Sequence, residues 1–399
     1  MVELSGARTP VKLWVAIEDV EQEALQQMFN AANHPLTFHH VAGMPDIHKG
    51  YSLPIGGVWA VGPNDAGVLS VCPAAVGYDI GCGMCACRTG ITVDELPADT
   101  VRTIAIEIKQ KLPAGVGSRA ASAGSLPDLP DGCSRLDLPI VDRDWQSAEV
   151  QLGTLGAGNH FAELQSDGDG RLWVMLHSGS RNVGWNVADH YMKVAHTHNG
   201  QFGNQAKDVA AWDLPTMPVD SDDGRAYLWQ MEWCLAFALE NRRVMMDLIK
   251  AIVKKHVWTT FGEMININHN AAWAEEHFGE TVMVHRKGAT QAFADQVGII
   301  PGSQGTRSYI VRGLGNPGSF CSCSHGAGRL LSRSKAKKTL DLEEEKRKMD
   351  EQGIIHFMSE QADLDEAASA YKPIDVVMAN QADLVEIGVE LTPLAVIKG

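Results

Sequence analysis

The stretch VGYDIGCGMCACR, residues 76–88, combines glycine turns with side chains that bind metal ions. Asp79 and Cys82 lie three positions apart within it. A carboxylate and a thiolate this close can bind one divalent ion, and a thiolate can also bridge two ions. The surrounding residues 38–90 are rich in Gly, Pro, Val and Ile, which predicts strands joined by tight turns. We therefore expect a metal-binding turn inside a β-rich region.

The other segments mix helical and strand-like patterns. Residues 225–257 carry the strongest helix signal, because apolar residues recur there at helical spacing. Residues 171–178 indicate a buried strand, and residues 296–313 alternate strand-like runs with glycine turns. Since no regular βαβ alternation is present, an α+β fold is favoured over a doubly wound one. We expect residues 1–399 to form a single compact α+β domain, with mixed β-sheets around a metal cleft flanked by helices. Further helices are predicted at residues 20–33, 95–112 and 335–352, and a long loop at residues 114–143.

Composition limits the class of protein. With 399 residues, of which 45% are hydrophobic, the chain can bury a core, and a mostly disordered protein is excluded. No apolar run approaches the roughly 18 residues of a membrane span, and the N-terminus lacks a signal-peptide pattern. A cytoplasmic protein without membrane contact is therefore predicted. The eight cysteines are too few for a disulfide scaffold, so reduced or metal-bound thiols are expected.

The net charge of −15 is unusual for a nucleic-acid enzyme, which is generally basic. Net charge says little about a local groove, however, and clustered carboxylates suit divalent cations. One basic stretch could form the edge of such a groove, although a solvated helix face is an equal alternative for its lysines. It comprises Arg329, Arg333, Lys335, Lys337 and Lys338.

Five of the fifteen histidines lie in short polar contexts bounded by small residues. A single histidine is more often a surface or core residue than a functional one, but five in such similar settings favour a functional site. The flanking Gly, Ser and Asn residues allow backbone and side chain to approach a ligand. The five are His48, His160, His177, His269 and His325.

Two other patterns remain open on spacing alone. Cys82 and Cys85 could form half of a structural zinc site with Cys321 and Cys323, although the one-residue spacing of Cys85 from Cys87 and of Cys321 from Cys323 is poor for zinc. Glycine-rich segments at 153–161, 299–310 and 324–329 could cradle a nucleotide. None of them is a Walker or Rossmann motif, and each alone fits an ordinary tight turn.

Taken together, these motifs resemble one family. The set resembles the RtcB family of RNA-splicing ligases, in order from about residue 40 to the end of the chain. The combination of DIGCGM with SCSHGAGR is its most specific part. The matching motifs are MPDIHKG, PAAVGYDIGCGM, LGTLGAGNHF, LHSGSR, NHN, RKGA, GIIPGSQGTRSYIVRGLGN, FCSCSHGAGR, SRSKA and a terminal KG.

The resemblance implies a role for each matching position. Asp79, Cys82 and His160 would hold one Mn²⁺, and Cys82 would bridge to a second Mn²⁺ bound by His177 and His269. His325 would be the nucleophile that accepts GMP from GTP, and Arg181 and Arg329 would bind RNA phosphate. Asp46, His48 and Lys287 would contact the metal ligands or the nucleophile and hold them in position, without touching the substrate themselves. The guanine nucleotide would contact Asn159, Glu163, Asn270, Ser303, Ser308, His325, Ala327, Gly328 and Lys398.

The resemblance also implies the reaction. GMP passes from GTP to the histidine, then to an RNA 3′-phosphate, and the 5′-hydroxyl of a second RNA end displaces it. A 2′,3′-cyclic phosphate would first be opened by water. Two alternatives stay open: a 3′-phosphate guanylyltransferase or cyclic phosphodiesterase that does not seal ends, and a non-catalytic RNA-end binder with a structural zinc. The physiological RNA, protein partners and oligomeric state are not predicted.

Overall fold

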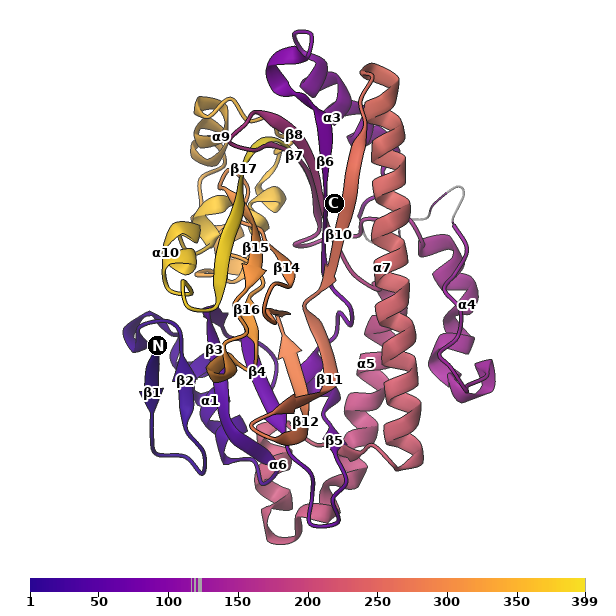
Figure 1. Ribbon diagram of the computed structural model, residues 1–399, viewed down its shortest axis with the longest axis vertical. Helices are drawn as coiled ribbons and strands as arrows, with labels where there is room; N and C mark the ends of the chain where they lie inside the picture. Colours follow the sequence, from indigo (N-terminus) through magenta and orange to yellow (C-terminus); the bar gives the residue numbers. More distant parts are fainter. Residues whose placement is uncertain (116, 118–119, 121–123, 399) are drawn as a thin grey trace.

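Two β-sheets form the framework of the computed structural model, which describes residues 1–115, 117, 120 and 124–398 (Figure 1). In the first sheet one pair of neighbouring strands, residues 11–13 and 37–48, is parallel and the other pairs are antiparallel. All neighbouring strands of the second sheet are antiparallel. The first has the order β1 (Val2–Leu4), β2 (Val11–Leu13), β3 (Thr37–His48), β4 (Ile55–Val61), β12 (Glu280–Lys287) and β11 (Asn270–His277). The second has the order β10 (Phe261–Asn268), β6 (Gly83–Thr92), β8 (Arg171–Ser178), β7 (Phe161–Ser166), β17 (Val385–Lys398), β15 (Ser308–Gly313) and β14 (Val297–Ile300).

Two short strand pairs and ten α-helices complete the described part of the chain. The pairs are β5 (Ser70–Val71) with β9 (Met217–Pro218) and β13 (Ala289–Gln291) with β16 (Ser322–Ser324). The helices are α1 (Gln22–Asn33), α2 (Pro73–Val76), α3 (Thr100–Lys111), α4 (Pro139–Gln151), α5 (Arg181–Ala195), α6 (Ala206–Trp212), α7 (Asp222–His256), α8 (Arg333–Thr339), α9 (Leu342–Glu351) and α10 (Ile374–Ala379).

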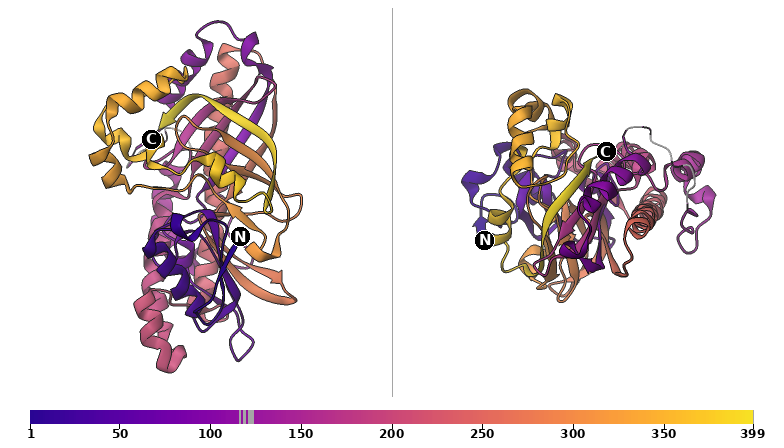
Figure 2. Two further views of the ribbon diagram at one scale, coloured as in Figure 1. Left: turned by 90° about the vertical axis from the view of Figure 1, so that its left-hand side faces the viewer. Right: turned by 90° about the horizontal axis from the view of Figure 1, so that it is seen from above.

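Helix α7 runs along the long axis of the molecule and packs against β6, β8 and β10 (Figure 1). Ser221 begins it by accepting a hydrogen bond from the amide of Gly224, and acidic residues occupy its first turn and basic residues its last. Among the described residues, none of the helices combines the length and apolar character needed to cross a membrane. In the side view of Figure 2 the indigo N-terminal strands lie in the lower half and the C-terminal helices in the upper half.

The structure confirms the predicted α+β class and most of the predicted elements. The segments 20–33, 95–112, 171–178 and 225–257 correspond to α1, α3, β8 and α7. Residues 38–90 contain β3, β4, β5 and β6, and residues 296–313 contain β14 and β15.

Two predicted elements were wrong in part. The single helix at 335–352 is two helices, α8 and α9, because the chain is extended at Leu340 and Asp341, where the Asp341 carboxylate accepts from the amide of Glu344 at 2.9 Å and begins a new helix. The long loop at 114–143 ends earlier, because Pro139 occupies the first turn of α4. Residues 116, 118, 119 and 121–123 of that loop lie outside the described residues.

Three strand ends that are distant in sequence meet beside α7. Gly83 opens β6 and pairs with Ser178 at the end of β8 and with Asn268 at the end of β10. A side chain at position 83 would lie 1.9 Å from the carbonyl oxygen of Ile267, so only glycine allows β6 and β10 to approach this closely. This pairing brings together Cys82, which directly precedes β6, and His177, the last residue but one of β8.

The buried side chain of Arg242, on α7, ties these ends to one another. Its guanidinium donates to the carbonyl oxygens of Gly81 and Ser178 at 3.0 and 2.8 Å. It also donates to the side-chain oxygens of Asn266 and Asn268 at 2.7 and 2.6 Å. The side chain is fully buried, so each of these acceptors would lose its partner if the guanidinium were removed.

We expect Arg242→Met to lower the free energy of unfolding by about 3 kcal/mol, because several buried acceptors lose their donor. Arg243→Met is the matched control, since Arg243 lies next to it on α7 and pairs with Glu240 and Asp247 on the surface. That change should cost less than about 1 kcal/mol. Urea unfolding measures both, and equal losses in the two variants would contradict the proposed role of Arg242.

Candidate metal centre and nucleotide pocket

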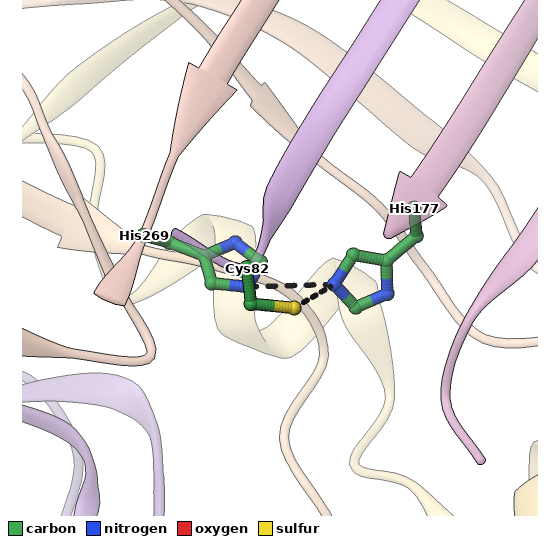
Figure 3. A group of neighbouring side chains, drawn as sticks. All are labelled: Cys82, His177 and His269. Carbon is green, nitrogen blue, oxygen red and sulfur yellow. Dashed lines mark hydrogen bonds between the residues drawn. The ribbon is translucent and has the colours of Figure 1, made fainter. Parts of the chain in front are cut away.

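One group of possible metal ligands lies where β6 begins and β8 and β10 end. The Sγ of Cys82 is 3.2 Å from the Nε2 of His177, and that nitrogen is 3.4 Å from the Nε2 of His269 (Figure 3). All three side chains are buried. His177 is the penultimate residue of β8, and His269 directly follows β10. Their donor atoms converge on one point.

A second group shares the same cysteine. The Nε2 of His160 lies 3.1 Å from the Oδ2 of Asp79 and 3.5 Å from the Sγ of Cys82. His160 precedes β7, and Asp79 lies on the turn before β6. The family resemblance implied both groups and the sharing of Cys82 between them, and the structure brings these five residues together.

The hydrogen bonds of the imidazoles determine which nitrogens are available. The Nδ1 atoms of His160 and His177 each lie 2.9 Å from a backbone carbonyl oxygen, of Leu155 and Asn159. Because a carbonyl oxygen only accepts hydrogen bonds, each of these two rings must carry a proton on its Nδ1. Burial lowers the pKa of His177 to about 3, and that of His269 well below its usual range, so both rings are neutral. The Nε2 of His177 therefore carries a free lone pair, which metal ligation requires.

The two acidic ligands depend on a positive partner. Burial opposes the charge of Asp79, but the hydrogen bond and charge of His160 outweigh it and lower the pKa of Asp79 to about 2. Burial, reinforced by Asp79, raises the pKa of the Cys82 thiol well above its ordinary range. A thiolate at this position therefore needs a cation beside it.

The residues fit bound divalent cations. Metal–ligand bonds of about 2.1–2.3 Å in a tetrahedron place neighbouring donor atoms roughly 3.4–3.8 Å apart. The separations around Cys82, 3.2 and 3.5 Å, are close to this range. The mixed oxygen, nitrogen and sulfur donors suit a borderline divalent transition metal.

His325 lies against this centre, with its ring centroid 4.9 Å from that of His269. Its Nδ1 is 2.6 Å from the Oδ2 of Asp46, which also accepts from the amides of His325 and Gly326. Burial opposes ionisation of Asp46, but the charge and hydrogen bond of His325 outweigh it and lower the pKa of that carboxyl. Asp46 thus holds the ring by Nδ1, and in the described part of the chain Nε2 makes no hydrogen bond.

A cavity of about 290 Å³ opens on one side of His325. Glu163 lies in its wall and is buried, and burial raises the pKa of this carboxyl to about 8. Gln165 donates to Glu163 at 2.7 Å and to the hydroxyl of Ser308 at 3.1 Å. Of the residues predicted to bind the nucleotide, those that line the cavity are Asn159, Glu163, Ser303, His325, Ala327, Gly328 and Lys398.

Two predicted nucleotide contacts lie elsewhere. Ser308 is behind Glu163 and supports it through Gln165. Asn270 lines a neighbouring cavity of about 760 Å³, where its amide donates to the carbonyl of Asp79 at 2.9 Å and accepts from the amide of Gly288 at 2.7 Å. Asn270 therefore orients the metal-binding turn.

The remaining predicted residues surround the two cavities. Arg181 and Lys287 line the larger one and Arg329 and His48 the smaller one. His48 donates through Nδ1 to the carbonyl of Asp46 at 2.9 Å, and Lys287 donates to the carbonyl of Ala74 at 3.1 Å. Arg329 is bound to Glu366 at 2.6 Å and to Tyr371 at 3.0 Å, so part of its guanidinium is already engaged.

Arg242 was not predicted as part of the site, and Arg333 was predicted only as part of a basic stretch. Arg333 pairs with Glu366 at 2.6 Å and lines both cavities. Arg242 could have been found, because it lies at helical spacing between the apolar residues Ala238 and Met245, on the face of α7 that is expected to be buried. A charge in a buried stripe signals a buried polar partner.

The zinc alternative finds no geometric support among the described residues. Cys85 and Cys87 lie on β6, whereas Cys321 and Cys323 lie at β16 in a different sheet. The thiols of Cys85, Cys87 and Cys323 contact backbone carbonyl oxygens, as Cys87 does with that of Gly262 at 3.2 Å. The groups of clustered ligands in the described chain contain Cys82 and none of these four.

A cluster of histidine, cysteine and aspartate side chains that could hold metal ions, beside a cavity, is typical of a metal-dependent enzyme. The family model described as "tRNA-splicing ligase RtcB" matches residues 27–399, and the chain belongs to the RtcB family. It is 37% identical to "RNA-splicing ligase RtcB" of Escherichia coli (strain K12), over 99% of each chain. It is 32% identical to "tRNA-splicing ligase RtcB" of Nanoarchaeum equitans, over 98% of this chain and 95% of that one.

We expect Cys82→Ala to lose bound divalent metal from both ligand groups, because both share its Sγ. Cys85→Ala is the control, since this neighbouring thiol is buried in the core and near no other ligand. Isothermal titration calorimetry with a divalent cation measures the loss. Retention of full stoichiometry by Cys82→Ala, with loss in Cys85→Ala, would favour a site built on the other cysteines.

Proposed function

We propose that this chain is an RNA ligase that joins RNA 3′-phosphate or 2′,3′-cyclic phosphate ends to 5′-hydroxyl ends, using GTP and two Mn²⁺ ions. The observation that carries the proposal is the position of His325, between the candidate metal centre and the nucleotide-sized cavity. Membership of the RtcB family supports RNA as the substrate. Both tRNA splicing and RNA repair fit this activity.

In the proposed first step, the Nε2 of His325 attacks the α-phosphorus of GTP. Asp46 accepts the Nδ1 hydrogen bond at 2.6 Å, which orients the ring and stabilises the positive charge that develops on it. The new N–P bond replaces the bond from phosphorus to the bridging oxygen, and pyrophosphate leaves. The two Mn²⁺ ions would neutralise the phosphate charge during this displacement.

The proposed second and third steps consume the activated GMP. An oxygen of the RNA 3′-phosphate attacks the phosphorus, the N–P bond breaks, and His325 regains its lone pair. The 5′-hydroxyl of the other RNA end then attacks the RNA phosphorus, loses its proton and expels GMP. Arg181 and Arg329, joined by Arg333, line the two cavities and would contact RNA phosphate oxygens.

Selection of guanine is assigned to Glu163. Guanine presents two N–H donors on one edge, and a carboxylate accepts both, whereas adenine lacks this pair. Glu163 is buried and held by Gln165, so its position is well defined. Lys398, which also lines the cavity, is held by Asp365 and could neutralise phosphate.

We expect His325→Ala to bind GTP but to form no covalent adduct and to seal no ends, because no other free nucleophile replaces Nε2. It should still join RNA that already carries a guanylylated 3′ end, since that step does not use the histidine. Mass spectrometry after treatment with GTP and Mn²⁺ detects the adduct, and a denaturing gel detects sealing.

His190→Ala, which removes an exposed histidine on α5, is the control for this experiment and should react as wild type. An adduct that persists in His325→Ala would refute the assignment of the nucleophile. An adduct in the wild type without sealing would favour a capping guanylyltransferase, and opening of a cyclic phosphate alone would favour a phosphodiesterase. No adduct and metal held by cysteines alone would favour the RNA-end binder.

We expect GTP binding to weaken as the pH falls through about 8, the pKa of Glu163, because protonation removes an acceptor for the guanine N–H groups. The loss should approach about tenfold per pH unit below this value. Glu163→Gln should bind GTP more weakly and lose the pH dependence that belongs to the carboxyl. Fluorescence titration with a labelled GTP analogue between pH 7 and 9 tests this, and identical pH profiles in both proteins would contradict it.

A further inference from the structure

Three aromatic side chains form a row at the larger cavity, and nothing described so far uses them. Tyr78 and Trp185 are stacked, with ring centroids 5.6 Å apart and planes 18° from parallel. Tyr51 continues the row, 5.8 Å from Tyr78 and tilted by 46°. Tyr51 and Trp185, at the two ends of the row, are each 48% exposed. We call these three residues the aromatic row.

The row lies within reach of the reacting groups. Its three residues line the same cavity as Asp79, Cys82, His160, His269 and His325. Tyr78 directly precedes Asp79 in the chain, so the row begins one residue from a candidate metal ligand. The smaller cavity, on the other side of His325, is the one assigned to GTP. The larger cavity therefore remains for the other substrate.

The charge of the larger cavity identifies the kind of substrate. Three cationic side chains line it, those of Arg181, Lys287 and Arg333, against the single carboxylate of Asp79 among its described residues. The ammonium of Lys287 lies 5.9 Å from the ring centroid of Tyr51 and donates to that residue's carbonyl oxygen. Cations that alternate with exposed rings match a ligand that combines phosphates with flat aromatic groups, as single-stranded RNA does.

Packing alone does not account for the row. Tyr78 packs against the hydrophobic core, but the rings at both ends leave about half of their surface in water. Trp258, on the loop after α7, is exposed to 88% and lines neither cavity, so it provides a comparison for an exposed tryptophan without such neighbours.

We infer that Tyr51, Tyr78 and Trp185 form a stacking surface for the unpaired nucleobases of an RNA end that enters the larger cavity. The inference rests on the proposed function and adds to it how the RNA is held next to the metal centre. Every base has a flat face, so stacking on these rings would tolerate any sequence. It would also require an unpaired end, because the bases of a duplex are already stacked.

The test measures the dissociation constant of short single-stranded RNA by fluorescence anisotropy, with intact RNA and with RNA in which one nucleotide next to the joined end lacks its base. The abasic nucleotide is placed in turn at the 3′-phosphate end and at the 5′-hydroxyl end. Four proteins are compared: wild type, Trp185→Ala, Trp185→Phe and Trp258→Ala. The readout for each protein is the dissociation constant for abasic RNA divided by that for intact RNA. A general loss of folded protein changes both constants alike and therefore cancels in the ratio.

For the wild type we expect loss of the base to weaken binding roughly tenfold at one of the two ends, as stacking on an aromatic side chain would predict. The ratio should fall toward one in Trp185→Ala, stay near the wild-type value in Trp185→Phe, which keeps a ring, and be unchanged in Trp258→Ala. A ratio near one in the wild type at both ends, or the same ratio in wild type and Trp185→Ala, would overturn the inference.

The same proteins separate failure of this inference from failure of the proposed function. A wild type that binds and seals RNA, with no effect of Trp185 on the ratio, would refute the aromatic row alone. A wild type that shows the expected ratios but seals no ends would refute the proposed reaction and retain the stacking surface. A wild type that does not bind RNA at all would refute both.

Discussion

The guanidinium of Arg242 connects the strand ends on which the candidate metal centre is built. It donates to the carbonyls of Gly81 and Ser178, one residue before Cys82 and one residue after His177. It also reaches Asn268, the residue before His269. A buried cation is costly unless it is well supplied with acceptors, and here each acceptor belongs to a segment that carries a metal ligand. The position of the ligands therefore depends on a contact in the interior, formed by a helix that contributes no ligand itself.

The two cavities on either side of His325 are proposed to bind different substrates. The smaller cavity contains the buried Glu163, which suits the edge of a purine. The larger cavity contains cationic and aromatic side chains, which suit RNA. The net charge of −15 is compatible with this, because the local potential in a cleft depends on the charges that line it, and divalent cations at the shared centre would add positive charge. An acidic chain can thus present a basic binding site.

Local patterns predicted most of the helices and strands, and failed where a single capping residue decided the outcome. The periodic apolar spacing of α7 extends over many turns, so its identity was clear from the sequence. The division between α8 and α9 depends on the carboxylate of Asp341, which acts over three residues within a charged segment that reads as one helix. The start of α4 depends similarly on Pro139. In both cases the helix propensity averaged over the segment gave no indication of the single residue at which a helix begins.

The sequence by itself indicated which side chains could act: Asp79, Cys82 and five histidines stood out by residue type and spacing, and the resemblance of the ordered motifs to one family implied which of them would be metal ligands and that His325 would be the nucleophile. Only the tertiary structure decided how close the candidate ligands lie to one another, which ring nitrogens of His160 and His177 face a carbonyl, that Ser308 stands behind Glu163, and that Tyr51, Tyr78 and Trp185 adjoin the cluster. The physical reason is the range of the interactions. Residue type and turn chemistry act over a few positions, whereas strand register and burial join segments such as β6 and β10 that are more than a hundred residues apart.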